Sequence, residues 1–466
     1  MPLLRRALEA IPSTYRTIIA LASPTLAAMI SQTLINQADH ILVGRLPAEE
    51  SIPGQTALQN SLILLWAVGG TLSTIVGVGT QAFTARRLGE RDDKRAGQVL
   101  TSSLLLSTVL GLVASIVFYL LTPYIFPLLV KDERVVALGV PFLRWRYVQI
   151  LPMVVSISYK SFFDGIGKTW VHMGAAISMN IINFVLNLAL VFGNWGFPRM
   201  GVEGSGLASC ISSYIGAALM LAWSLRGELR ERFQYYRAQA VDSRLARDIL
   251  RLAWPSGVAV VLAMSGFGFF MYVVDQLDLR AGHVAGEGIY KAATSNIINF
   301  FQLVFISCIA YGSATATLVG QNMGARKIDA AENYVWTSAK IGAVLFTAVG
   351  LLTCLYPHAI MALWSKDQAV IEVATPILRV LGACEPVACL ALVFTYALYG
   401  AGNARFVMVV EGSLHFTCLM PASYLLGLVF GLGIWGVWIA MMAYIVLMAC
   451  IMAAKFTTGT WKAIHI

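Results

Sequence analysis

Residues Leu21–Leu46 read LASPTLAAMISQTLINQADHILVGRL. This apolar stretch is long enough to cross a bilayer, which takes about 20 residues, and it contains no Asp, Glu, Lys or Arg before Asp39. A carboxylate inside a membrane span costs about 2.5–3.5 kcal/mol on insertion scales, so it normally faces a bundle interior or a water-filled cavity. We therefore predict a membrane helix in which Asp39 meets a proton, an ion or a cationic ligand. The alternative is an acid that is solvated near the outer interface.

The composition of the whole chain supports a membrane protein. Of its 466 residues, 58% are hydrophobic and 12% are charged, whereas soluble domains carry about 25% charged residues. No alternating segments of about ten residues, which a β-barrel would need, are present. The net charge of +9 comes from residues in the predicted loops, so it does not indicate nucleic-acid binding.

Apolar periodicity predicts an all-α integral membrane protein with twelve spans in two six-helix lobes. The first lobe is residues 1–225, the polar segment 226–251 is a cytoplasmic linker, and the second lobe is residues 252–466. The expected spans are 17–43, 56–85, 97–122, 142–163, 171–193 and 202–225, followed by 252–276, 290–319, 335–357, 375–398, 405–428 and 434–455.

The Lys and Arg residues predict the orientation of these spans. Most of the 33 fall in the set of loops that includes both ends of the chain. Since cytoplasmic loops carry an excess of Lys and Arg, we expect a multi-pass protein of the cytoplasmic (inner) membrane with both termini in the cytoplasm.

An internal repeat relates the two lobes. A shift of 235 residues superposes glycines, prolines and charged residues at the ends of spans, without gaps from residue 77 to 202. The matching pairs are Gly77/Gly312, Thr80/Thr315, Gly89/Gly324, Arg91/Arg326, Asp132/Asp367, Pro141/Pro376, Arg144/Arg379, Gly165/Gly400, Gly167/Gly402 and Gly196/Gly431. Each half has an even number of spans, so we expect lobes related by a pseudo-two-fold axis along the membrane normal, an arrangement typical of transporters.

At this point the chain resembles the multidrug and toxic compound extrusion (MATE) transporters over essentially its whole length. The resemblance rests on LASPT and NQADHILVGRL in the first span, GTQAFTARRLGERDDKRAG, FFDGIGKT and NIINFVLNLALVFG, together with LAWPS, VGQNMGARKIDAA, LYGAGNAR and GIWGVWIA in the second half. It implies a two-lobed antiporter that exports organic cations in exchange for protons or sodium ions.

The resemblance also implies a coupling site in the first lobe. Asp39 matches the aspartate of span 1, and Asn183 and Asn187 match paired positions of span 5. One branch of the family has an aspartate at the second of these positions, where this chain has Asn187. Another branch uses a glutamate in span 7, but this chain has no acid there before Asp275.

Further polar residues share the helix faces of this predicted site. Asn180, Asn183 and Asn187 are spaced to lie on one stripe, where they either join helices as hydrogen-bonding amides or form an ion-linked network with Asp39. Gln32 and Asn36 lie on the same side of their helix as Asp39, and they either orient its carboxylate or satisfy each other.

The second lobe offers three further candidates. Glu385 precedes Pro386 in span 10, and it is either a functional acid or a solvated pore-lining one. Glu411 and His415 are four residues apart in span 11, which favours a buried Glu–His pair and leaves a proton relay as the alternative. Pro24 and Pro255 are expected in the first turn of their helices, where proline costs little, rather than at hinges.

The coupling ion is expected to be a proton or a sodium ion, with Na⁺ held by Asp39, Asn183 and Asn187. The missing second acid favours protons. The chain carries no nucleophile triad, metalloprotease or nucleotide-binding motif, so we expect neither an enzyme nor a cofactor. The seven cysteines lie in apolar stretches and are interpreted as free core residues.

We expect the partners to be organic cations and the lipid bilayer, with no nucleic acid and a monomeric chain. A lipid-linked saccharide flippase of the same superfamily is the alternative function. A flippase would favour basic residues in the cavity, and the predicted span interiors offer only Lys160 and Lys340 as clear basic residues.

Overall fold

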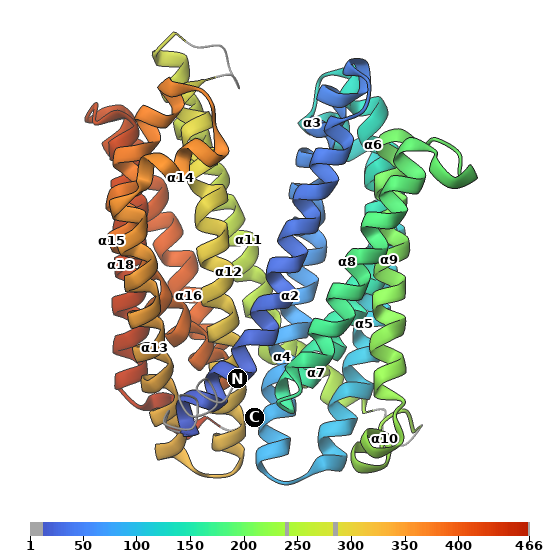
Figure 1. The fold of residues 1–466 in the computed structure, drawn as a ribbon. Helices are drawn as coiled ribbons and strands as arrows, with labels where there is room; N and C mark the ends of the chain where they lie inside the picture. Colours follow the sequence, from blue (N-terminus) through green and yellow to red (C-terminus); the bar gives the residue numbers. More distant parts are fainter. Residues whose placement is uncertain (1–12, 238–241, 283–287, 465–466) are drawn as a thin grey trace, which may run out of the picture. The chain divides into compact units, whose positions relative to one another are not determined.

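The computed structural model describes residues 13–237, 242–282 and 288–464, and helices make up nearly all of this part of the chain (Figure 1). The ends of the chain and residues 238–241 of the predicted linker lie outside the described residues. The long helices are α2 (Ser13–Gly44), α3 (Ala48–Leu65), α4 (Thr71–Gly89), α5 (Asp93–Leu129), α6 (Glu133–Val148), α7 (Ile150–Gly165), α8 (Thr169–Phe192), α9 (Gly201–Ser224), α11 (Ser243–Arg280), α12 (Ile289–Gly324), α13 (Ile328–Leu355), α15 (Gln368–Gly400), α16 (Ala404–Leu414) and α18 (Gly433–Thr457).

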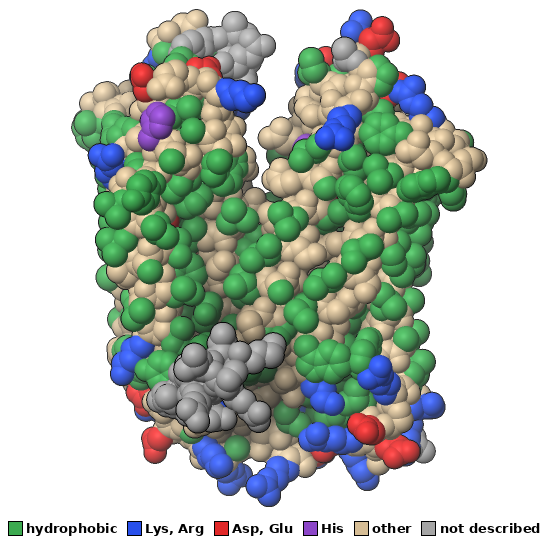
Figure 2. Space-filling view, viewed as in Figure 1, with side chains coloured by type: hydrophobic (Ala, Val, Ile, Leu, Met, Phe, Trp, Pro, Cys, Tyr) green, Lys and Arg blue, Asp and Glu red, His purple; other side chains and the backbone are tan. Residues whose placement is uncertain are grey.

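Eleven helical stretches of the described chain are long and apolar enough to cross a membrane. They correspond to the predicted spans, except that the predicted fourth span is divided at Gln149 between α6 and α7. The predicted second span begins in α3 and continues through a π-helical turn, η1 (Trp66–Gly70), into α4. Charged side chains gather at the ends of the helices and apolar side chains cover the length between them (Figure 2). The chain is therefore an all-α, multi-pass membrane protein.

The contacts divide the chain into two units. One is Ser23–Gly257, and the other takes in the described residues up to Ala22 and those from Val258 onward. In the first unit α8 packs on α9, α4 and α5 pack on α7, and α6 packs on α9. In the second unit α15 packs on α12, α13 and α18.

The same turns recur in the two units at the shift of 235 residues. Helices α5, α6 and α8 begin at Asp93, Glu133 and Thr169, and α13, α15 and α16 begin at Ile328, Gln368 and Ala404. The left-handed residue after α4 is Arg91, with φ of 61°, and the one after α12 is Arg326, with φ of 57°. Gly167 and Gly402 are also left-handed, with φ of 78° and 90°. The repeat therefore fixes the backbone of the turns as well as the order of the helices.

Two expectations about local structure are wrong. Pro24 and Pro255 lie inside α2 and α11, not in a first turn, because both helices begin in polar residues before the apolar run. The segment predicted as a linker also contains a short helix, α10 (Gly227–Phe233), and the start of α11. Arg232 of α10 donates a hydrogen bond to Asp93 at 2.8 Å, which raises the pKa of Arg232. This ion pair holds α10 against the start of α5.

Candidate functional site

Helix α2 carries Asp39 into the interior of the Ser23–Gly257 unit. The side chain is 8% exposed, so the carboxylate is buried and not solvated. A buried carboxylate needs hydrogen-bond donors or a positive charge, because water no longer solvates it. The surroundings of Asp39 supply both, from three other helices.

Asn187 of α8 provides the direct donor. Its Nδ2 donates to Asp39 Oδ1 at 2.9 Å and to the Asn183 backbone oxygen at 3.0 Å. Asn187 is completely buried, and its Oδ1 has no hydrogen-bond partner. A hydrogen bond to a charged group contributes about 1.5–3 kcal/mol, so Asn187 is a substantial stabiliser of the Asp39 carboxylate.

Asn183 lies one turn earlier on α8 and faces the same carboxylate. One end of its amide lies 3.2 Å from Asp39 Oδ1, and the other lies 3.2 Å from Ser209 Oγ of α9. With its nitrogen toward Asp39 the amide donates to the carboxylate, and its oxygen then accepts from Ser209. With its oxygen toward Asp39 it faces a group that can donate only when the carboxyl is protonated. The amide is therefore placed to respond to the charge on Asp39.

Arg146 of α6 adds a positive charge to this site. The residue is 9% exposed, and its charge interacts with Asp39 through space. No direct ion pair joins the two side chains among the described residues. Both residues line two small cavities, each about 20 Å³ in volume. Each cavity has room for about one water molecule, so the site fits a small ion with its water, not a drug-sized molecule.

The other predicted first-unit residues line one of these cavities without bonding to Asp39. Gln32 and Asn36 of α2 and Asn180 of α8 all contribute to its wall. Asn180 Nδ2 donates to Ser31 Oγ of α2 at 2.7 Å, so it joins α8 to α2. None of the printed hydrogen bonds of the described residues connects Gln32 or Asn36 with the Asp39 carboxylate.

Glu385 of the second unit is isolated from solvent. Its side chain is 0% exposed, it accepts a hydrogen bond from Thr353 Oγ1 at 2.8 Å, and its Oε2 has no partner. The interpretation of Glu385 as a solvated pore-lining acid is therefore wrong. Helix α15 continues through Pro386 without ending.

Glu411 and His415 do meet, but not through their side chains. His415 Nδ1 lies 2.7 Å from the backbone oxygen of Glu411. The favoured interpretation, a buried pair of the two side chains, is therefore wrong, because the histidine bonds to the peptide group. The Glu411 side chain is half-buried.

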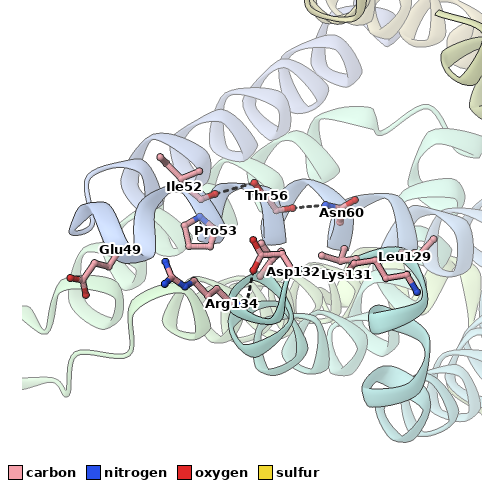
Figure 3. Close-up of a pocket in the computed structure, with 11 residues that line it drawn as sticks. Glu49, Ile52, Pro53, Thr56, Asn60, Leu129, Lys131, Asp132 and Arg134 are labelled. Atoms are coloured by element: carbon pink, nitrogen blue, oxygen red, sulfur yellow. Dashed lines mark hydrogen bonds between the residues drawn. The ribbon is translucent and has the colours of Figure 1, made fainter. Parts of the chain in front are cut away.

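A larger pocket of the first unit lies away from Asp39, at the start of α3 and the turn between α5 and α6 (Figure 3). It measures about 530 Å³ and has both signs of charge on its wall, with Glu49 and Asp132 near Lys131 and Arg134. Asp132 Oδ1 also accepts from the backbone N–H of Arg134, as the cap of α6. None of the predicted site residues lines this pocket.

Sequence reasoning missed Arg146 and the serines of α9. Arg146 lies inside the predicted fourth span, so the rule that selected Asp39, an ionisable residue within a span, also selects it. Ser205, Ser209 and Ser212 recur at helical spacing in an apolar stretch, and this stripe was a further signal. The cysteines agree with the prediction, since all seven are free. No cluster of three or more potential metal-ligating His, Cys, Asp and Glu residues occurs in the described chain.

Comparisons with known proteins bear on this arrangement of helices and polar residues. The sequence model of the MatE family matches residues 24–189 and 281–425. The probable multidrug resistance protein NorM of Thermotoga maritima is 22% identical over 463 residues, covering 97% of this chain and 94% of the relative. The multidrug resistance protein PmpM of Pseudomonas aeruginosa is 25% identical over 417 residues, covering 89% and 84%.

Solved structures share the fold. An outward-facing multidrug resistance MATE family transporter of the MOP superfamily superposes with a TM-score of 0.87 at 20% identity, covering 97% of this chain and 98% of the other. A MOP superfamily transporter from Pyrococcus furiosus, whose binding pocket is described as reversed in polarity, superposes with a TM-score of 0.86 at 21% identity, with the same coverage. The family model covers more than half of the chain and the helices follow the same fold, so this protein belongs to the multidrug and toxic compound extrusion (MATE) family of transporters.

Proposed function

We propose that the protein is a secondary active multidrug efflux antiporter, not an enzyme, that exports organic cations in exchange for protons or sodium ions. The observation that carries the proposal is a buried Asp39 that is hydrogen-bonded by Asn187 and faced by Arg146. Relatives named as multidrug resistance proteins support the substrate class. We place the protein as a monomer in the cytoplasmic (inner) membrane, with both termini in the cytoplasm.

Binding of a coupling ion at Asp39 changes the contacts that α2 makes with α8. A charged carboxylate favours amide nitrogens toward it, whereas a neutral one no longer attracts them and can donate to an amide oxygen. The same event leaves the positive charge of Arg146 uncompensated. These changes bias the packing of α2 against α8, and a ligand shifts the populations of two states by its difference in affinity for them.

The donor set favours a proton over a sodium ion at Asp39. Asn187 turns its N–H toward the carboxylate, and Arg146 adds a positive charge. Sodium would require oxygen ligands, and the unpartnered Oδ1 atoms of Asn187 and Asn180 are the nearest amide oxygens available for that role. Asn187 would first have to turn its amide. A proton needs only the carboxylate.

The alternative is a flippase for lipid-linked saccharides, and Arg146 is the observation in its favour. A buried guanidinium suits an anionic pyrophosphate group, and this arginine was absent from the reasoning that set the alternative aside. Lys160, however, pairs with Asp164 at 2.7 Å, and Lys340 is exposed. A single guanidinium facing an acid is a weaker anion site than a flippase needs, so we favour the antiporter.

Transport by the purified wild-type protein tests the proposal. Proteoliposomes would be loaded with pH gradients and sodium gradients separately, and the uptake of ethidium would be followed by fluorescence. We expect ethidium to accumulate against its gradient when the pH gradient is imposed. Accumulation driven only by sodium would assign the other ion, and no accumulation under either gradient would contradict the antiporter and favour a test with a lipid-linked anion.

A further inference from the structure

Glu411 carries a carboxylate that the protein leaves without a partner. The residue lies near the end of α16, directly before a π-helical turn, η4 (His415–Leu419), and π-helical turns occur frequently at functional sites. Within the described residues, the Glu411 side chain has neither a hydrogen bond nor an ion pair, and no basic residue balances its charge. A charged group in a span is costly in that condition, so this position calls for a cation or a proton.

Aromatic side chains surround this carboxylate. Its charge acts on the hydroxyl groups of Tyr396 and Tyr399 of α15 and of Tyr444 of α18. The rings of Tyr396 and Tyr399 are nearly perpendicular, with centroids 5.8 Å apart. The ring of Tyr444 packs 4.7 Å from that of His415. Three electron-rich rings therefore stand around one acid.

His415 contributes a further acceptor. Because the Glu411 backbone oxygen can only accept, His415 Nδ1 must donate to it, so in the neutral imidazole Nε2 carries the lone pair. The ring is held in place by close packing against α11, where a Cβ added at Gly266 would lie 2.2 Å from His415 Cδ2. The groups gathered here are hydrogen-bond acceptors, hydroxyls and aromatic faces.

We propose that Glu411, Tyr396, Tyr399, Tyr444 and His415 form a binding site for an aromatic organic cation in the second unit. A carboxylate supplies the opposite charge, and tyrosine rings attract cations through their faces by about 0.5–2 kcal/mol each. The site differs from that of Asp39, whose carboxylate already has an amide donor and an arginine. The cavities at Asp39 hold about one water molecule, so they suit the coupling ion and not the exported compound.

The inference rests on the proposed function for the substrate class, but binding can be measured without any ion gradient. Ethidium would be titrated into the purified protein, and its fluorescence would give the dissociation constant. We expect Glu411→Gln to weaken binding about tenfold or more, because the charge attraction is removed. Glu332→Gln is the matched control, since it removes an acid of the same unit that already pairs with Lys462 at 2.6 Å.

Variants of Tyr444 test the aromatic part separately, in case Glu411→Gln fails to fold. Tyr444→Phe keeps the ring and should bind ethidium about as tightly as the wild type, whereas Tyr444→Leu should bind it about two- to fivefold more weakly. Equal binding by Glu411→Gln, Tyr444→Leu and the wild type would overturn the site. Wild-type transport of ethidium combined with that result would leave the proposed function intact. Binding without gradient-driven transport would contradict the antiporter alone.

Discussion

Replacing Asn187 by leucine should remove the strongest support of the Asp39 carboxylate while keeping the volume of the side chain. The fully buried amide donates to Asp39 Oδ1 at 2.9 Å. A hydrogen bond to a charged group contributes about 1.5–3 kcal/mol, and one between neutral groups about 0.5–1.5 kcal/mol. Since 1.4 kcal/mol is a factor of ten, losing the bond to Asp39 should change the balance between its charged and neutral forms about 10- to 100-fold.

Asn180→Leu is the matched control for this substitution. Asn180 lies on the same helix and is also buried, but it donates to the neutral Ser31 hydroxyl at 2.7 Å. Initial rates of gradient-driven ethidium uptake would be measured in proteoliposomes with equal amounts of each protein. We expect Asn187→Leu to lower the rate at least about tenfold, and Asn180→Leu to lower it much less. Equal rates in the two variants would refute the assignment of Asn187 to the coupling site.

Two further substitutions test the charge balance and the helix packing. Arg146→Gln removes the positive charge facing Asp39, worth on the order of 1–2 kcal/mol at about 10 Å; the antiporter should then bind ethidium at least as tightly as before, as a binding titration would show, whereas a flippase would lose transport of its anionic substrate. Gly350→Ala would place a Cβ 2.2 Å from the backbone oxygen of Gly382 and should destabilise the protein by about 1–3 kcal/mol. Gly268→Ala, with nothing within 4 Å of the added Cβ, should leave the thermal unfolding temperature unchanged or higher.

The helices could be predicted from the sequence because apolar runs and turn residues mark their ends. The repeat at a shift of 235 residues even located the left-handed turns at Gly167 and Gly402. The positions of Pro24 and Pro255 could not be predicted from hydrophobicity, since α2 and α11 extend into polar residues that carry no apolar signal.

The candidate site could be predicted only in part, for a physical reason. Helical spacing places Asn183 and Asn187 on one face, but it does not decide which amide reaches Asp39. Contacts such as that of Arg146 with Asp39 join residues far apart in the chain, so they depend on how α6 packs beside α2. The bond from His415 to the Glu411 peptide oxygen depends likewise on the side-chain conformation. Spacing predicts neighbours on one helix, whereas the chemistry of a site depends on packing between helices.

The most direct test of the account is gradient-driven uptake of ethidium by Asp39→Asn. This substitution keeps the size of the side chain and removes the group that binds the coupling ion. Proteoliposomes with a pH gradient would be compared for the wild type and the variant, with matched protein amounts and matched binding of ethidium. The account predicts accumulation by the wild type and none by Asp39→Asn. Full accumulation by Asp39→Asn would contradict the assignment of coupling to Asp39.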